Sequence, residues 1–233
     1  MSLELAVLIV LLMPVVYVVI PTVLNLALRI LFWRRSGRSD RVFITFDDGP
    51  DPLQTPKILA ELERSGVTAA FFMLGEKVER FPDIVAAVRS GGHEIGEHSY
   101  SHSFPWFTNP IRTLLDLTRC RKVMNETLGR DACTLFRPPF GKFNTITLLY
   151  ALFGKKKNVF WNVDLSGFRK TDQAGPSRPS LADIKPGTVV LLHEAEGREL
   201  AKDLGTIETL RAILEDVSSK GIKTGNLRDL YES

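Results

Sequence analysis

The chain has 233 residues, of which 44% are hydrophobic and 24% are charged, and its formal net charge is +3. This composition suits a folded protein with a sizeable core. The excess positive charge lies in residues 1–41, where five arginines face only Glu4 and Asp40, and the rest of the chain holds equal numbers of acids and bases. The folded part therefore lacks the basic excess of a nucleic-acid-binding domain, and we expect no nucleic acid as a partner.

The first segment is unusually apolar. From Leu3 to Trp33 it contains one acid, Glu4, and one base, Arg29. A bilayer core requires about 20 mostly apolar residues in helical form, so we predict a membrane anchor over residues 1–35. The segment is too long for the apolar region of a signal peptide, and no basic residue precedes it. A buried core helix is the alternative interpretation.

Two prolines interrupt this segment, and proline disrupts the interior of a helix. Pro14 and Pro21 predict one membrane span from about Leu3 to Ile20 and a second helical piece from about Thr22 to Arg35. Trp33 would then lie at the level of the lipid headgroups. The second piece could lie in the membrane interface rather than cross the bilayer.

Residues 36–40 are polar and predict a short linker to a second domain, residues 41–233. In this domain strand-like runs alternate with helix-like runs. The expected strands are Val42–Phe46, Val67–Met73, Glu94–Glu97, Cys133–Phe136, Val159–Val163, Val189–Leu192 and a weak one near Ile222. The expected helices are Pro56–Ser65, Pro82–Ser90, Ile111–Leu128, Thr145–Phe153 and Thr206–Lys220. Such alternation predicts an α/β fold with a mostly parallel sheet, and about seven strands favour a barrel or partial barrel.

Residues capable of chemistry follow the expected strands. Asp47 and Asp48 come after the first strand, His98 after the third, Arg137 after the fourth and His193 after the sixth. Parallel barrels build their active sites at the carboxyl ends of the strands. We therefore expect these side chains to lie together.

A second histidine, His102, lies four residues after His98. On one helical turn this spacing directs both imidazoles the same way. Two histidines and a carboxylate are a common catalytic site for a divalent metal, usually zinc. One of Asp47 and Asp48 could complete that site while the other deprotonates a water molecule. The combination predicts a metal-assisted hydrolase, and two merely packed or exposed histidines are the alternative.

Two further residues complete the expected chemistry. Arg137 is the cation that could hold the adjacent carboxylates, and Pro138 and Pro139 stiffen the segment that presents it. His193, as an imidazolium, could protonate a leaving amine. An ordinary surface arginine and a satisfied core histidine are the alternatives.

These motifs resemble those of the polysaccharide deacetylase family, the NodB-homology domain of carbohydrate esterase family 4. The family's first motif is matched by Thr45–Pro50, its His-Ser/Thr-x-x-His motif by His98–His102, its Arg-x-Pro-aromatic motif by Arg137–Phe140 and its Leu-x-His motif by Leu191–His193. The resemblance covers the whole domain after the linker. It implies a distorted (β/α) barrel that hydrolyses N-acetyl groups on amino sugars.

The resemblance also implies a role for each matched residue. Asp47 would be the base, tethered by Arg137, and His193 would be the acid. Asp48, His98 and His102 would hold a divalent metal, with Zn²⁺ as the expected ion. The residues expected to contact substrate are Pro139, Phe140, Phe168, Leu191 and Trp106, the last from an aromatic loop at Phe104–Phe107 that is either a core plug or a lip touching substrate or membrane.

The chain also departs from the family. The fourth motif usually ends in Asp-Trp, but here Gly167 stands in place of the carboxylate and Phe168 in place of the tryptophan. Glu97 stands where the family often has asparagine before the first histidine. These changes bear on rate and substrate preference more than on metal binding, and Glu94, Glu97 or Glu194 could restore the missing charge.

Basic residues next to an apolar segment favour the cytoplasmic side. Here they all follow it: Arg34, Arg35, Arg38 and Arg41. Cys120 and Cys133 are expected to be free thiols in a reducing compartment, a single disulfide being the alternative. We therefore expect a catalytic domain anchored on the cytoplasmic side of the inner membrane, where it would reach a saccharide on a lipid carrier. The alternative functions are a deacylase for another group such as formyl, a cell-wall or chito-oligosaccharide deacetylase, and a catalytically silent saccharide-binding relic.

Overall fold

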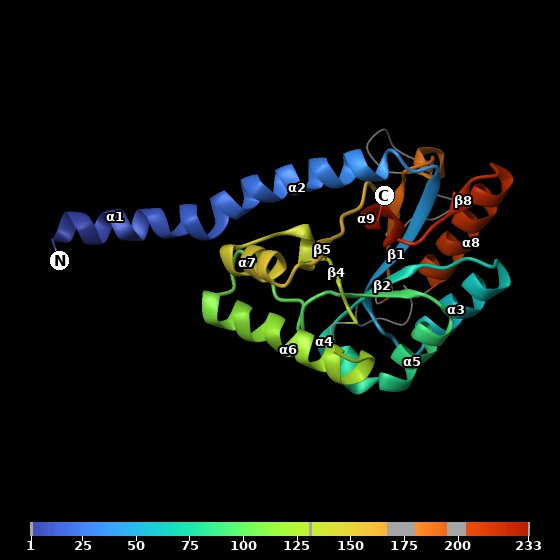
Figure 1. The fold of residues 1–233 in the computed structure, drawn as a ribbon, viewed down its shortest axis with the longest axis horizontal. Coiled ribbons are helices and arrows are strands. Elements are labelled where there is room, and N and C mark those ends of the chain that lie inside the picture. Colours follow the sequence, from blue (N-terminus) through green and yellow to red (C-terminus); the bar gives the residue numbers. More distant parts are fainter. Residues whose placement is uncertain (1, 131, 167–179, 195–203, 233) are drawn as a thin grey trace.

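Parallel strands form the sheet of this α/β domain (Figure 1), in a computed structural model that describes residues 2–130, 132–166, 180–194 and 204–232. The strands are β1 (Arg41–Gly49), β2 (Ala70–Met73), β3 (Glu94–Glu97), β4 (Leu135–Phe136), β5 (Lys157–Asn158), β6 (Val163–Asp164), β7 (Val189–His193) and β8 (Lys223–Thr224). Their order is β5-β4-β3-β2-β1-β7-β6, and β8 pairs with the start of β1. In the described part of the chain, β5 and β6 each pair with one neighbour only, so the expected barrel is a half-barrel.

Successive side chains of β1 point to opposite faces of the sheet, as the strand period requires. Ile44 and Phe46 enter one buried cluster, which also contains apolar residues of the helices α3, α5, α6 and α8. Phe43 enters a second buried cluster, to which Phe32 contributes from the N-terminal helix. The two faces of the sheet are thus covered by different parts of the chain.

The expected helices of the domain are all present. They are α3 (Thr55–Arg64), α5 (Pro82–Ser90), α6 (Pro110–Leu128), α7 (Thr145–Phe153) and α8 (Leu204–Ser219). Proline stands at an N-terminal position of α3, α5 and α6, where its missing N–H costs nothing. Two short helices, α4 (Gly75–Arg80) and α9 (Asp229–Glu232), were not expected from the sequence.

One expected strand, Val159–Val163, is found only at its last residue, Val163, which begins β6. Residues 159–162, between β5 and β6, form no strand, although Val159 and Phe160 are apolar and buried. The reason is a residue distant in the sequence: the guanidinium of Arg137 donates from Nε to the carbonyl of Val159 at 3.3 Å and from Nη2 to that of Phe160 at 3.5 Å. These carbonyls serve a buried cation instead of a neighbouring strand.

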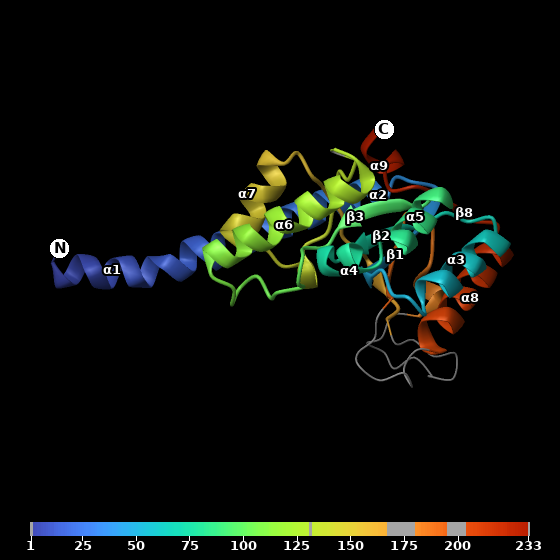
Figure 2. The same cartoon turned by 90° about the horizontal axis from the view of Figure 1, so that it is seen from below.

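The N-terminal segment is one continuous helix rather than two pieces. It consists of α1 (Leu3–Pro14), a π-helical turn at Val15–Val19 and α2 (Ile20–Ser36). Pro21 falls at the start of α2, and the widened turn that follows Pro14 lets the helix continue, as π-bulges do. In Figures 1 and 2 the helix extends far beyond the domain at its N-terminal end and lies along the domain at its C-terminal end.

The C-terminal half of this helix packs against the domain. Its buried positions are Pro21, Asn25, Phe32 and Ser36, which recur at the spacing of one helix face. Asn25 donates from Nδ2 to the carbonyl of Gly141 at 2.9 Å, and Trp33 donates from Nε1 to the carbonyl of Trp161 at 3.0 Å. The indole N–H of Trp33, which the sequence had placed at the lipid headgroups, therefore hydrogen-bonds to the domain.

Within the described residues, one helix is long and apolar enough to cross a membrane, namely Leu11–Ser36, whose most apolar window of 18 residues has a mean hydropathy of 2.2. Only 11% of its most apolar window is buried, which is unlike a core helix. The division into an anchor, a linker and a catalytic domain stays a prediction.

Candidate active site

Asp47 and Asp48 are consecutive residues of β1, yet both reach the same site. Side chains of consecutive strand residues normally point to opposite faces. Here the pairing of β1 with β2 shifts register between Asp47 and Gly49, and Asp48 adopts a φ of 69°. Such a bulge re-aims a side chain beside an active site. Asp47 is 2% exposed, whereas Asp48 is partly open to solvent.

Arg137 forms a buried ion pair with Asp47. The arginine is fully buried and donates from Nη1 to Asp47 Oδ1 at 2.5 Å and to Thr45 Oγ1 at 3.0 Å. Its guanidinium also lies 4.1 Å from the ring centroid of Phe72. Burial raises the pKa of Asp47, and the charge of Arg137 limits that rise. The carboxylate of Asp47 is thus a better proton acceptor than that of an exposed aspartate. Arg137 bonds to Oδ1 of this carboxylate and not to Oδ2.

The two histidines lie on a loop after β3, not on a helical turn as their spacing had predicted. Ser99 and His102 have φ values of 69° and 56°, and the backbone N–H groups of Tyr100 and Ser101 donate to the carboxylate of Asp116 on α6. Few non-glycine residues adopt such φ values, and those that do often lie at functional sites. The loop brings the imidazole centroids of the two histidines to 5.1 Å.

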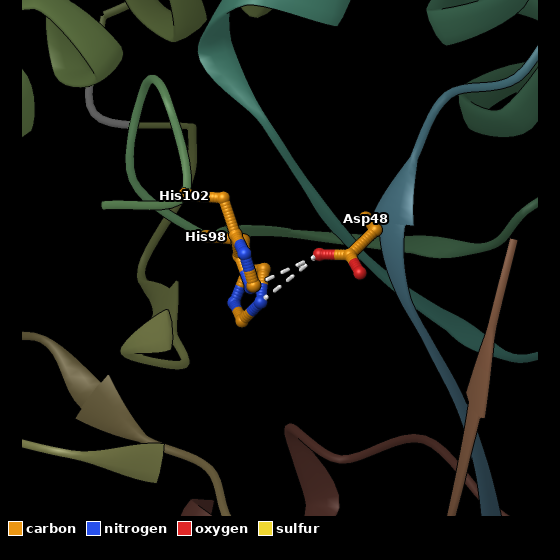
Figure 3. Close-up of side chains that lie close together, drawn as sticks. All are labelled: Asp48, His98 and His102. Atoms are coloured by element: carbon orange, nitrogen blue, oxygen red, sulfur yellow. Dashed lines mark ion pairs between the residues drawn. The ribbon is translucent and has the colours of Figure 1, made fainter. Parts of the chain in front are cut away.

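Asp48, His98 and His102 converge on one point (Figure 3). Asp48 Oδ1 lies 3.4 Å from His98 Nε2 and 3.3 Å from His102 Nε2. His98 Nδ1 lies 2.7 Å from the carbonyl of Arg137, to which it can only donate, and this leaves the Nε2 lone pair facing Asp48. Burial also lowers the pKa of His98 to about 3, so its imidazole is neutral.

This donor set fits a divalent metal. Asp48 Oδ1 is a buried oxygen without a hydrogen-bond partner, and a buried polar atom of that kind calls for a partner. Two imidazole nitrogens and one carboxylate oxygen within 4.8 Å of one another are the ligands of many catalytic zinc sites. A carbonyl on the second nitrogen of a ligating histidine, as in His98, is the usual support.

His193 is the last residue of β7, in register with Asp47. The pairing of parallel strands places it beside the aspartate. Its Nδ1 lies 2.6 Å from Ser166 Oγ, and this bond engages only one of the two ring nitrogens. Leu191 is buried in the same strand, at 2% exposure.

Aromatic rings border the site on the side of His102. The ring of Phe140 lies 4.5 Å from that of His102 and 4.7 Å from that of Phe104, and Phe104 in turn stacks on Phe107 at 5.2 Å. Phe140 is 45% exposed and Phe107 is 87% exposed, so the loop is a lip rather than a core plug. Trp106 is half-buried beside the ammonium of Lys142 at 4.8 Å. Pro139 is buried, and Phe168 lies outside the described residues.

Comparison with known proteins matches the motifs. The model of the family described as polysaccharide deacetylase matches residues 34–154. A peptidoglycan-N-acetylglucosamine deacetylase of Bacillus cereus is 32% identical over 192 residues, covering 82% of this chain and 68% of that protein. A chitooligosaccharide deacetylase of a Bradyrhizobium species is 30% identical over 188 residues, covering 74% of this chain and 80% of that protein.

A solved structure agrees with these relatives. It is the Bc1960 peptidoglycan N-acetylglucosamine deacetylase in complex with 4-naphthalen-1-yl-N-oxidanyl-benzamide, with a TM-score of 0.73, 30% identity, and coverage of 84% of this chain and 90% of that one. The chain belongs to the polysaccharide deacetylase family. The expected family, fold and enzyme class are therefore confirmed.

In the present chain, the structure adds residues to the candidate site that the sequence analysis had not singled out. Ser166, the residue before Gly167, contacts the expected acid His193, while Gly167 itself lies outside the described residues. Asp116 fixes the histidine loop, and Lys77 donates from Nζ to the carbonyl of Asp48 at 2.5 Å. The only signal for Ser166 in the sequence is its place directly before Gly167, in the motif that departs from the family.

The three glutamates considered as replacement charges have other partners. Glu94 accepts from the backbone N–H groups of Leu227 and Arg228, and Glu97 pairs with Lys156 Nζ at 2.6 Å and with the hydroxyl of Tyr150. Glu194 is fully buried and accepts from Thr55. Burial raises the pKa of Glu194 to about 8. None of these bonds is made to His193.

Proposed function

We propose that the chain is a metal-dependent hydrolase that removes N-acetyl groups from amino sugars of a saccharide, as the names of its relatives indicate for peptidoglycan and chitooligosaccharide. The observation that supports this most directly is the meeting of two groups of residues at one end of the sheet. Asp47, held by Arg137, lies next to the cluster of Asp48, His98 and His102.

In this proposal Asp48, His98 and His102 hold a divalent ion, with Zn²⁺ as the expected one. When bound, such an ion supplies Lewis-acid polarisation of the amide carbonyl and lowers the pKa of a water molecule. The protein's own residues carry the proton transfers. Asp47 accepts the proton of the attacking water at Oδ2, because Oδ1 is occupied by Arg137.

His193 then protonates the leaving nitrogen as the C–N bond breaks. Its Nδ1 is held by Ser166, so in this proposal Nε2 carries the proton, and the pairing of β1 with β7 puts His193 in register with Asp47. Protonation is needed because an amine leaves far more readily than an amide anion. The products are acetate and the free amino sugar.

The test is acetate release from N-acetylated chitooligosaccharides and peptidoglycan fragments, with the metal removed and with Zn²⁺ restored. We expect His102→Ala to lose most of its bound metal and its activity, because a three-ligand site cannot lose one ligand. Asp47→Asn should keep the metal and lose turnover by about 10²–10⁴-fold, as expected for a general base. Metal loss in Asp47→Asn would overturn the division of roles between the aspartates.

The acyl group and the alternative of a silent relic are tested by the same assay. N-formyl substrates hydrolysed faster than N-acetyl ones would favour a deformylase. Retained metal with no amine released from any substrate would favour a saccharide-binding relic.

We propose further that the N-terminal helix anchors the enzyme in the membrane with the catalytic domain in the cytoplasm. Its support is the apolar helix of Leu11–Ser36 and the arginines that end it, Arg34 and Arg35. Both cysteines are free thiols, which agrees with a reducing compartment. Protease added to intact spheroplasts tests this, since digestion of the domain would place it outside.

A further inference from the structure

The domain exposes large apolar side chains mainly at one place. Within the described residues after Asp40, they are concentrated on the loop before α6, on the first two turns of α6 and on α7, with Leu53 and the site residue Phe140 elsewhere. The members are Phe107, Ile111, Leu114, Leu115, Leu149, Leu152 and Phe153. Apolar side chains grouped in this way mark an interaction surface.

This surface lies where the N-terminal helix leaves the domain. The hydroxyl of Tyr17, in the π-helical turn, donates to the carbonyl of Thr108 at 2.6 Å and lies 3.2 Å from Thr113 Oγ1. Phe107 and Leu114 are the chain neighbours of those two threonines. Figure 2 shows the start of α6 next to the point where α1 departs, and Figure 1 shows α7 between α6 and the N-terminal helix.

The candidate membrane span includes the first contacts between the helix and the domain. Hydrogen bonds to the domain begin at the carbonyl of Val16 and at Tyr17. The apolar span Leu11–Ser36 starts before these contacts and continues past them. If this helix crosses a bilayer, whose hydrocarbon core is about 30 Å thick, the end of the domain around Tyr17 therefore enters the membrane with it.

The neighbouring charges favour lipid over a second copy of the chain. Arg112 lies among these apolar residues at the start of α6, and the next acid along the helix, Asp116, is bonded to backbone N–H groups of the histidine loop. Lys122, farther along, pairs with Glu126 at 3.8 Å. Apolar turns that carry a basic residue suit an anionic bilayer surface. A symmetric dimer through this face would bring like charges together.

The surface is continuous with the mouth of the site. Ring contacts run from the expected ligand His102 through Phe140 and Phe104 to Phe107 without a break. Anything that fixes Phe107 at the membrane therefore fixes the opening of the site near the headgroups.

We propose that Phe107, Ile111, Leu114 and Leu115 enter the bilayer beside the helix at Tyr17 and hold the mouth of the site at the lipid surface. This anchoring favours a saccharide attached to a membrane lipid over a soluble one. The substrate preference rests on the proposed deacetylase activity, whereas the insertion of these side chains into the bilayer does not.

The immersion is tested with the full chain in vesicles of phosphatidylglycerol and phosphatidylcholine. Both native thiols are buried, and burial raises the pKa of Cys120 and of Cys133, so an introduced cysteine can be labelled selectively. A polarity-sensitive fluorophore at Ile111→Cys should shift to shorter wavelength and be quenched by spin-labelled lipid. The same label at Glu63→Cys, exposed on α3, is the control and should do neither.

Equal behaviour of the two labels would overturn the proposal. So would a wavelength shift without lipid quenching, which indicates contact with a second copy. The functional part is tested with the double variant Ile111→Ser and Leu115→Ser. We expect unchanged rates on soluble chitooligosaccharide and a loss of about tenfold on an acetylated saccharide tethered to vesicle lipid.

Equal losses on both substrates would overturn the lipid-attached preference. If the unmodified enzyme deacetylates neither substrate, the proposed activity fails while the quenching result still decides the immersion.

Discussion

The two sides of the candidate site are held by different means. On the inner side, Asp47, His98 and Arg137 are almost fully buried and bonded to one another or to backbone carbonyls. On the outer side, Asp48 and His102 are partly exposed and sit at positive φ. The inner side is fixed by a network in which each polar group depends on the next. The outer side is fixed by backbone conformation, which leaves room for substrate.

Removing Arg137 should break the inner side most severely. Arg137→Met leaves the carboxylate of Asp47 buried without a partner, and loss of one member of a buried pair costs about 3–5 kcal/mol. We expect a lower urea midpoint at pH 7 together with loss of acetate release. Arg137→Lys is the matched variant, because it keeps the charge and loses the contacts to Val159 and Phe160. An unchanged midpoint in Arg137→Met would mean that the pair does not stabilise the fold.

The contrast between the sides also explains what the sequence could predict. Spacing and strand order were enough to bring Asp48, His98, His102 and Arg137 to one edge, because the ends of parallel strands meet there. Alternation alone could not place Asp47 and Asp48 in one site, since that depends on a bulge formed by tertiary pairing.

One other miss has the same origin. The sequence of Val159–Val163 has the composition of a strand, but Arg137, more than twenty residues earlier, takes its carbonyls. Local propensity is overridden where distant partners decide the hydrogen bonds. The continuous N-terminal helix is a different case: Pro14 and Pro21 predict a break, but the adjacent backbone widens into a π-helical turn and keeps one helix.

Glu194 is a further buried residue, directly after His193 in the chain. It should make the free energy of unfolding decrease as the pH rises. Burial raises its pKa from 4.5 to about 8, so the folded state holds a proton that the unfolded state releases. Between those values stability should decrease with a slope of up to about 1.4 kcal/mol per pH unit. Glu194→Gln removes that contribution. The unfolding temperature of both proteins from pH 5 to pH 8 measures it, and parallel curves would show that Glu194 does not titrate there.

A side chain at Gly49 should destabilise the fold, because a Cβ at this position would meet the carboxylate of the buried Glu194. We expect Gly49→Ala to cost about 1–3 kcal/mol, as overpacking of a filled site does. In a Glu194→Ala background the same change should cost clearly less, since the clash is gone. The double-mutant cycle by urea denaturation isolates this coupling. Additive costs would instead attribute the loss to the backbone of Gly49.

The two histidines provide the finest test of the contrast, because they have the same expected role and different surroundings. Measured without metal, His98→Gln should lose about 1 kcal/mol, since its Nδ1 bond to the buried carbonyl of Arg137 is lost. His102→Gln should change stability by no more than about 0.5 kcal/mol, as its ring is 26% exposed. Both should lose bound metal alike. Equal destabilisation of the two would show that the outer side is as firmly held as the inner one.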